Sequence, residues 1–106
     1  SRSDGKKQES SESRKVIKRM QAEQRERLQP LRDRVKRAEA KLAELQIARA
    51  ELDRQLADPE LYDDQNKSKL QDSLLELARL EKESDATEAE WMLASEELEA
   101  LGADCS

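Results

Sequence analysis

The fold is decided by residues 28–56, LQPLRDRVKRAEAKLAELQIARAELDRQL. Apolar residues recur in this stretch at alternating steps of three and four positions, at Leu28, Leu31, Val35, Ala38, Leu42, Leu45, Leu52 and Leu56. This spacing places them along one face of an α-helix, which is the pattern of a coiled-coil seam. Arg49 interrupts the series, and we interpret it as a register device with its charged head in solvent rather than as a partner site.

A second stretch repeats the alternation at Leu70, Ser73, Leu77, Leu80, Ser84, Thr87, Trp91, Ala94, Leu98 and Leu101, with a weak centre at Ser84 and Thr87. In an antiparallel pair of helices, the numbers of facing residues add to a constant. They add to 125 or 126 here, for Leu56 with Leu70, Leu45 with Leu80, Val35 with Trp91 and Leu28 with Leu98. The sequence therefore predicts an all-α, antiparallel two-helix coiled-coil hairpin with a short helical turn at the tip and a basic N-terminal helix.

The two stretches are joined by LADPELYDD, residues 56–64. Asp58 is suited to cap a helical turn that begins with Pro59, and Asp63, Asp64 or Asn66 can cap the helix that follows. Gly102 is expected to cap the C-terminal end of the second helix. Tyr62 has two possible roles, a stacking contact at an exposed tip or closure of the corner against Leu56 or Leu61, of which we favour the second.

The same register predicts ion pairs beside the seam, between Arg27 and Glu97, Arg34 and Glu90, and Lys41 and Glu83. Each exposed pair is worth under about 1 kcal/mol, so the pairs select the register more than they stabilise it. Trp91, beside Ala38 and Val35, is expected to make the largest single apolar contact.

The N-terminal part is polar, and residues 1–13 are predicted to be a linker without secondary structure. Pro30 either begins a new helix or kinks a continuous one, and the sequence leaves the choice open. The expected coiled-coil domain covers 14–102, with a basic helix at 14–29, a first arm at 30–57, a tip at 58–65, a second arm at 66–102, and a tail at 103–106.

The composition argues against an enzyme. The chain has 106 residues, no His and two Gly, so the commonest general base and metal ligand is missing and no phosphate-binding glycine loop is present. Cys105 has no partner for a disulfide or a zinc site, and no apolar run approaches the roughly 18 residues that span a bilayer. We expect no catalytic residue and no bound metal or cofactor, and, since Ser1 stands where Met would begin, a piece of a longer protein.

Charge is divided unequally along the chain. Residues 1–50 hold 15 Lys and Arg against 8 Asp and Glu, whereas residues 51–106 hold 5 against 17, so the halves carry +7 and −12. The first heptad register, extended backwards, aligns Lys18, Arg25 and Arg32, with Lys36 four residues further on. This line could follow successive phosphates of a nucleic acid, or it could be a solvated face that offsets the acidic second helix. No aromatic residue is interleaved with it, so base-specific recognition is not expected.

The tip DPELY (Asp58 to Tyr62) and the ending at Trp91 and LEAL (Leu98 to Leu101) resemble the C-terminal coiled-coil domain of ABC-F ATPases, in the YheS/Uup branch. The resemblance covers about residues 14–102. It implies the tail of a cytoplasmic protein with two tandem ATP-binding cassettes and no membrane domain, which acts on ribosomes during translation. ATP and magnesium would belong to the cassettes of that parent protein, because none of the ATPase motifs lies in these residues.

The resemblance also implies a nucleic-acid-binding extension, and with the charge pattern it makes Lys18, Arg25, Arg32 and Lys36 the expected contacts to ribosomal RNA, transfer RNA or DNA. The alternative is a protein-interaction or spacer module that docks on a ribosomal protein through the acidic second helix, or that positions the cassettes. We expect a monomer, and the small residues in the middle of the seam leave weak dimerisation open.

Overall fold

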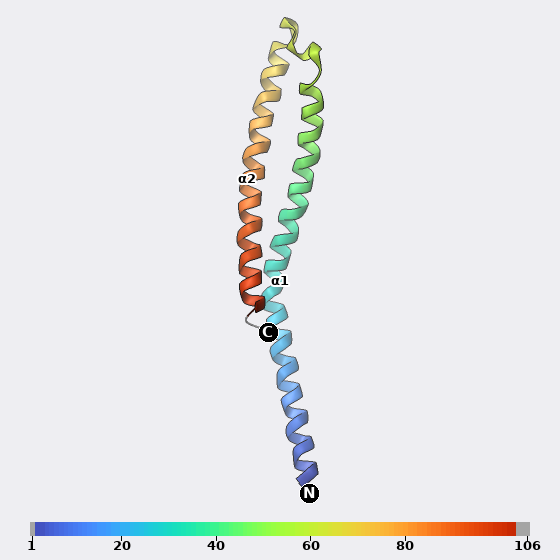
Figure 1. The fold of residues 1–106 in the computed structure, drawn as a ribbon, viewed down its shortest axis with the longest axis vertical. Coiled ribbons are helices and arrows are strands. Elements are labelled where there is room, and N and C mark those ends of the chain that lie inside the picture. Colours follow the sequence, from blue (N-terminus) through green and yellow to red (C-terminus); the bar gives the residue numbers. More distant parts are fainter. Residues whose placement is uncertain (1, 104–106) are drawn as a thin grey trace.

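The computed structural model describes residues 2–103, and the side chains of residues 11–102. Two long helices, α1 (Arg2–Leu56) and α2 (Lys67–Ala103), run antiparallel and side by side (Figure 1). Two short 3-10 helices, η1 (Pro59–Tyr62) and η2 (Asp64–Asn66), join them at the tip. The molecule measures 94 × 17 × 15 Å. The prediction of an all-α helical hairpin is confirmed.

The core of the hairpin is a single narrow seam. Its buried residues are all predicted seam positions, namely Leu28, Leu31, Ala38, Leu45, Leu52, Leu80, Thr87 and Ala94. Leu45, Leu52 and Leu80 pack together near the tip, with Leu56 and Leu77 against them. Thr87 is buried without a polar penalty, because its hydroxyl donates a hydrogen bond of 2.7 Å to the Glu83 carbonyl. Burial of these leucines is the main favourable free energy of folding.

Trp91 is only partly buried at its seam position. It is 36% exposed, and it lines a groove beside the seam with Leu42 and Ala43. Ala94 and Thr87, the next seam residues on either side, are small and buried, whereas the larger indole ring keeps part of its surface exposed.

Pro30 lies inside α1, which continues through it. Proline removes the hydrogen bond to the carbonyl four residues earlier, that of Glu26, but both residues are exposed and water can replace the lost donor. The expected boundary between a basic helix and a first arm therefore does not exist. The structure also differs at residues 2–13, expected to lack secondary structure, which continue α1 from Arg2. Extending a helix that is already nucleated costs far less than starting one.

The far end of α2 is closed by α1 rather than by a glycine. Gly102 is part of α2, which ends at Ala103, and no glycine in the described residues has a positive φ, so the predicted glycine cap is wrong. Instead, the Gln24 side chain on α1 donates a hydrogen bond of 3.0 Å to the Leu101 carbonyl. That carbonyl belongs to the last turn of α2, where carbonyls lack partners within the helix. Cys105 and the rest of the tail beyond Ala103 lie outside the described residues.

The tip is held by side chains that satisfy the backbone. Asp58 accepts a hydrogen bond of 3.0 Å from the Glu60 amide, and Pro59 begins η1, as predicted. The Tyr62 hydroxyl donates to the Leu56 carbonyl at 2.7 Å, which closes the corner at the end of α1. Asn66 reaches back to the Glu60 carbonyl at 2.8 Å, whereas Asp63, expected as a possible cap, makes no capping hydrogen bond with its side chain.

The seam predicts that two leucines of α2 contribute very differently to the free energy of unfolding. Leu80 is 2% exposed and Leu75 is 71% exposed. Leu80→Ala should lower the free energy of unfolding by about 2–5 kcal/mol, because it leaves a cavity in the seam. Leu75→Ala should change it by less than about 0.5 kcal/mol. Urea denaturation followed by circular dichroism at 222 nm measures both, and equal losses would contradict the seam.

The corner yields a second prediction. Tyr62→Phe keeps the ring but removes the donor to the Leu56 carbonyl, and it should lower the free energy of unfolding by about 0.5–1.5 kcal/mol. Urea denaturation measures this loss as well. Ile47→Ala, a change at an exposed position of α1, serves as the control and should be nearly neutral. A Tyr62→Phe variant as stable as the parent would show that the hydroxyl does not hold the corner.

Candidate nucleic-acid interface

The four predicted contact residues lie on one face of α1. Lys18, Arg25 and Arg32 are spaced by seven residues and Lys36 follows by four, so in an unbroken helix all four project from the same side. Because α1 continues through Pro30, the alignment is kept between Arg25 and Arg32. From Lys18 to Lys36 the line is about 27 Å long at the α-helical rise. We call these four residues the basic line.

All four side chains of the basic line are exposed. None of the ion pairs among the described side chains involves them; the paired cations are Arg34, Arg49, Arg54 and Arg79. Their charges are therefore available to an anion from solution. A protein that neutralises phosphates with such groups releases counterions from the nucleic acid, which is the main source of non-specific affinity.

Part of the basic line lies beside the C-terminal end of α2. Arg25, Arg27 and Arg32 line a groove that also includes Gly102, in the last turn of α2. That turn has no basic residue of its own, and the end of a helix carries a partial negative charge. The two arginines of the line thus lie near the end of α2, whereas Lys18 lies on the N-terminal overhang. We define this overhang as residues 2–18 of α1, which precede every α1 residue that lines this groove; the N-terminal end of α1 extends past α2 (Figure 1).

Cross-helix ion pairs follow the predicted register only in part. Arg34 pairs with Glu90 at 2.7 Å, as predicted, and also with Glu97 at 3.6 Å. Glu97 was expected to pair with Arg27, but the forked guanidinium of Arg34 lies between the two carboxylates and reaches both. Glu83 was expected to pair with Lys41. It pairs instead at 3.1 Å with Arg79, four residues away on the same helix, a contact that needs no partner helix.

The Arg79 cluster lies on the side of the hairpin where Arg34 reaches α2. Hydrogen bonds from Arg79 lower the pKa of Glu76, and the carboxylates of Glu76 and Glu83 raise the pKa of Arg79. Because the pKa of Glu76 is lower in the folded state, this pair stabilises the fold at neutral pH and its contribution is lost as the pH falls through that value. Arg49, the interruption of the seam, directs its guanidinium outward to Asp53 at 3.4 Å and to Glu81 at 3.3 Å.

A groove on the other side of the hairpin was missed by the sequence analysis. It has a volume of about 540 Å³ and is lined by Glu39, Leu42, Ala43, Gln46, Ser84, Glu88, Trp91 and Met92. The Trp91 indole N–H donates to a Glu39 carboxylate oxygen at 3.1 Å. Glu39 and Gln46 continue the seven-residue spacing of Lys18, Arg25 and Arg32, so the groove and the basic line share one face. This seven-residue spacing, continued to Glu39 and Gln46, is the sequence signal that could have located the groove.

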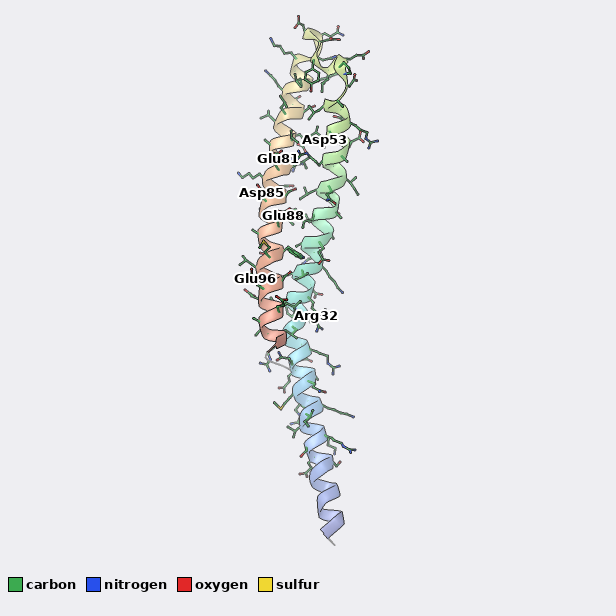
Figure 2. The ribbon with its side chains drawn as sticks, in the orientation of Figure 1. Arg32, Asp53, Glu81, Asp85, Glu88 and Glu96 are labelled. Carbon is green, nitrogen blue, oxygen red and sulfur yellow. The ribbon has the colours of Figure 1, made fainter. Side chains whose placement is uncertain are left out.

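Acidic side chains recur along α2, and one of them, Glu88, lines this groove. Glu81, Asp85, Glu88 and Glu96 recur at helical spacing, and Figure 2 labels them along α2 together with Asp53 near the end of α1. Asp85, Glu88 and Glu96 take part in no ion pair among the described side chains. We call Asp53, Glu81, Asp85, Glu88 and Glu96 the acidic line.

Comparisons with protein-family models, with curated proteins and with solved structures find no match to this chain. Neither of the long helices, in the part that the structure describes, combines the length and apolarity that a membrane crossing requires. Within the described residues, no group of three or more Asp, Glu or Cys is placed to hold a metal ion.

The contrast between Arg34 and Lys41 is testable with double-mutant cycles. The cycle of Arg34→Ala and Glu90→Ala should give a coupling free energy of about 0.2–1 kcal/mol, the range of exposed pairs. The matched cycle of Lys41→Ala and Glu83→Ala should give a coupling near zero. Urea denaturation of the single and double variants provides both values, and a larger coupling for Lys41 would mean that the register differs from the structure.

Proposed function

We propose that this hairpin is a non-catalytic nucleic-acid-binding domain that tethers a larger protein to RNA or DNA through phosphate contacts of Lys18, Arg25, Arg32 and Lys36. The observation that carries the proposal is the basic line itself, four exposed cations on one side of an unbroken helix with no ion-pair partner among the described side chains. The resemblance of the tip and of the second helix to ABC-F ATPases supports a cytoplasmic parent protein that acts in translation.

The geometry favours binding without sequence specificity. The line lies on a thin rod, where only Arg25 and Arg32 of the four border a groove, and its contacts are long, flexible cations that suit phosphate oxygens. The overhang, which carries Lys18, is free of α2 and lets a nucleic acid approach the helix from several directions. Affinity should therefore depend on charge density and salt rather than on base sequence.

Binding to short duplex and single-stranded RNA and DNA over a salt series tests the proposal. If all four cations contact phosphates, the logarithm of the affinity should fall with the logarithm of salt at a slope of roughly −3 to −4. The variant K18E/R25E/R32E/K36E should not bind at low salt. Fluorescence anisotropy of labelled oligonucleotides measures both effects, and the order of affinities identifies the preferred polyanion.

A matched control separates the basic line from net charge. The variant R19E/R27E/R37E/K41E makes the same change in net charge at exposed positions on other sides of α1. This variant should keep a substantial part of the parent protein's affinity for the oligonucleotides. If the two variants lose binding equally, attraction is a property of the whole surface and the proposed contacts are wrong. If the parent protein does not bind at low salt, the nucleic-acid proposal fails altogether.

The acidic line and the groove favour a second candidate, a protein-docking module. Trp91 and Met92 are accessible in the groove and are bordered by Glu39 and Glu88, which would suit a basic partner such as a ribosomal protein. Cosedimentation with purified ribosomes distinguishes the two functions. Under the docking function, D85K/E88K/E96K should abolish binding while K18E/R25E/R32E/K36E is silent, and the reverse result supports phosphate contacts.

A further inference from the structure

A strip of large apolar side chains on α1 is left uncovered beyond the end of α2. Ile17 lies eleven residues before Leu28, about three helical turns, and therefore on the same side of α1. Met20 has the same relation to Leu31. The two leucines are 6% and 8% exposed, whereas Ile17 and Met20 are 53% and 61% exposed and Val16 beside them is 50% exposed. We call Val16, Ile17 and Met20 the apolar strip.

The strip lies at a step in the rod. The Gln24 side chain donates its hydrogen bond to the Leu101 carbonyl in the last turn of α2. Met20 and Ile17 lie one and two turns before Gln24, in the part of α1 that continues past α2 (Figure 1). Because a helix is about 10 Å wide, the end of α2 projects by about that distance beside the strip. A flat lipid surface pressed against this side would meet α2 first, whereas a helix in line with α2 can lie on the strip.

The groove at this step carries positive charge. It has a volume of about 690 Å³, and its lining includes Met20, Leu28, Glu23 and three arginines, Arg25, Arg27 and Arg32. None of the three arginines takes part in an ion pair among the described side chains. The helix that covers the rest of this side of α1 is acidic, since α2 holds ten Asp and Glu against four Lys and Arg. An acidic helix on the strip would continue this charge pattern.

A second copy of the overhang does not fit the strip. If the Ile17 residues of two antiparallel overhangs faced each other, facing numbers would add to 34, twice 17. Residues 2–10 of one copy would then lie beside residues 24–32 of the other, where α2 already lies against α1. A parallel second helix α1 would run into α2 in the same way. The occupant must therefore be a helix that has one end at the step.

We propose that the apolar strip binds an acidic amphipathic helix of a partner protein, which lies in line with α2 and has its N-terminus at the step. The apolar side of this helix covers the strip as α2 covers Leu28 and Leu31. Its N-terminal end, which carries a partial positive charge, faces the partial negative charge at the C-terminal end of α2. Acidic residues in its first turns stabilise that N-terminus and lie close to the three arginines of the groove.

This contact goes beyond the proposed function and does not rest on it. Lys18 follows Ile17 by one residue, about 100° further round α1, so the basic line and the apolar strip lie on different sides of the helix. They share only Arg25 and Arg32, which line the groove at the step. Phosphate contacts leave the strip exposed, because phosphate oxygens do not cover apolar side chains.

A synthetic peptide of about 18 residues, long enough to form a helix, serves as the probe. It carries Leu at alternating steps of three and four, Glu at the other positions of its N-terminal half, and Ala and Gln elsewhere. Fluorescence anisotropy of the labelled peptide with the whole chain at about 100 mM salt measures its Kd. A second peptide with Lys in place of every Glu should bind about tenfold more weakly, because its charges then face the arginines.

Two variants of the chain locate the site. V16Q/I17Q/M20Q removes the strip without changing any charge, and it should weaken binding of the acidic peptide at least about tenfold. I47Q/L74Q/L75Q changes three apolar residues that are exposed elsewhere, and its affinity should stay within about twofold of the parent value. Circular dichroism verifies that both variants remain helical.

Three results would overturn the proposal. The acidic peptide does not bind the parent chain at about 100 µM, the range of a weak complex. The Lys peptide binds as tightly as the acidic peptide, so that the occupant is not acidic. The two variants lose affinity equally, so that the peptide adsorbs to apolar residues in general.

Two further measurements separate the helix from other occupants. Oligonucleotide binding should be the same for the parent chain and V16Q/I17Q/M20Q, which keeps the whole basic line, and a loss would mean that nucleic acid occupies the strip. Sedimentation velocity should show a monomer for both, and a dimer that only the parent forms would mean that a second copy covers the strip. If the peptide binds the strip and no oligonucleotide binds the chain, the proposed function fails while this inference stands.

Discussion

The close contact of two helices along one seam of leucine and small residues determines the rest of this structure. With one Trp, one Tyr and no Phe, the chain cannot build a wide core, and a two-helix seam is the arrangement that buries its leucines. The small residues Ala38, Thr87 and Ala94 are buried in the same seam as the leucines. Everything else, including charges, groove and overhang, is then forced to the outside of a thin rod.

Much of this could be predicted from the sequence, because a seven-residue repeat fixes both the helical face and, in a hairpin, the partner residues. The buried positions and the Arg34–Glu90 pair follow from that arithmetic. The partial exposure of Trp91 does not, since the repeat assigns a position to the seam without regard to its size. Gln24 could not be predicted as the residue that closes α2, because this depends on where α2 ends relative to α1.

The candidate site, too, could be predicted from the sequence only in part. The alignment of Lys18, Arg25 and Arg32 needs only the repeat and an unbroken helix, and the sequence left the second condition open at Pro30. The groove depends on the partial exposure of Trp91 and on its hydrogen bond to Glu39, which the repeat does not specify. Neighbouring charges of both signs on one face emerge only when the two helices are placed beside each other, because the basic and acidic residues come from distant parts of the chain.

The continuity of α1 has a mechanical consequence. A single helix runs from Arg2 to the beginning of the tip, and its inner half is braced by α2, so the hairpin has no joint at Pro30. A domain attached at the N-terminal end would therefore be connected to the tip through a stiff lever. A small tilt at Arg2 would move the tip through a wide arc, and rotation of the helix about its own axis would turn the charged face with it.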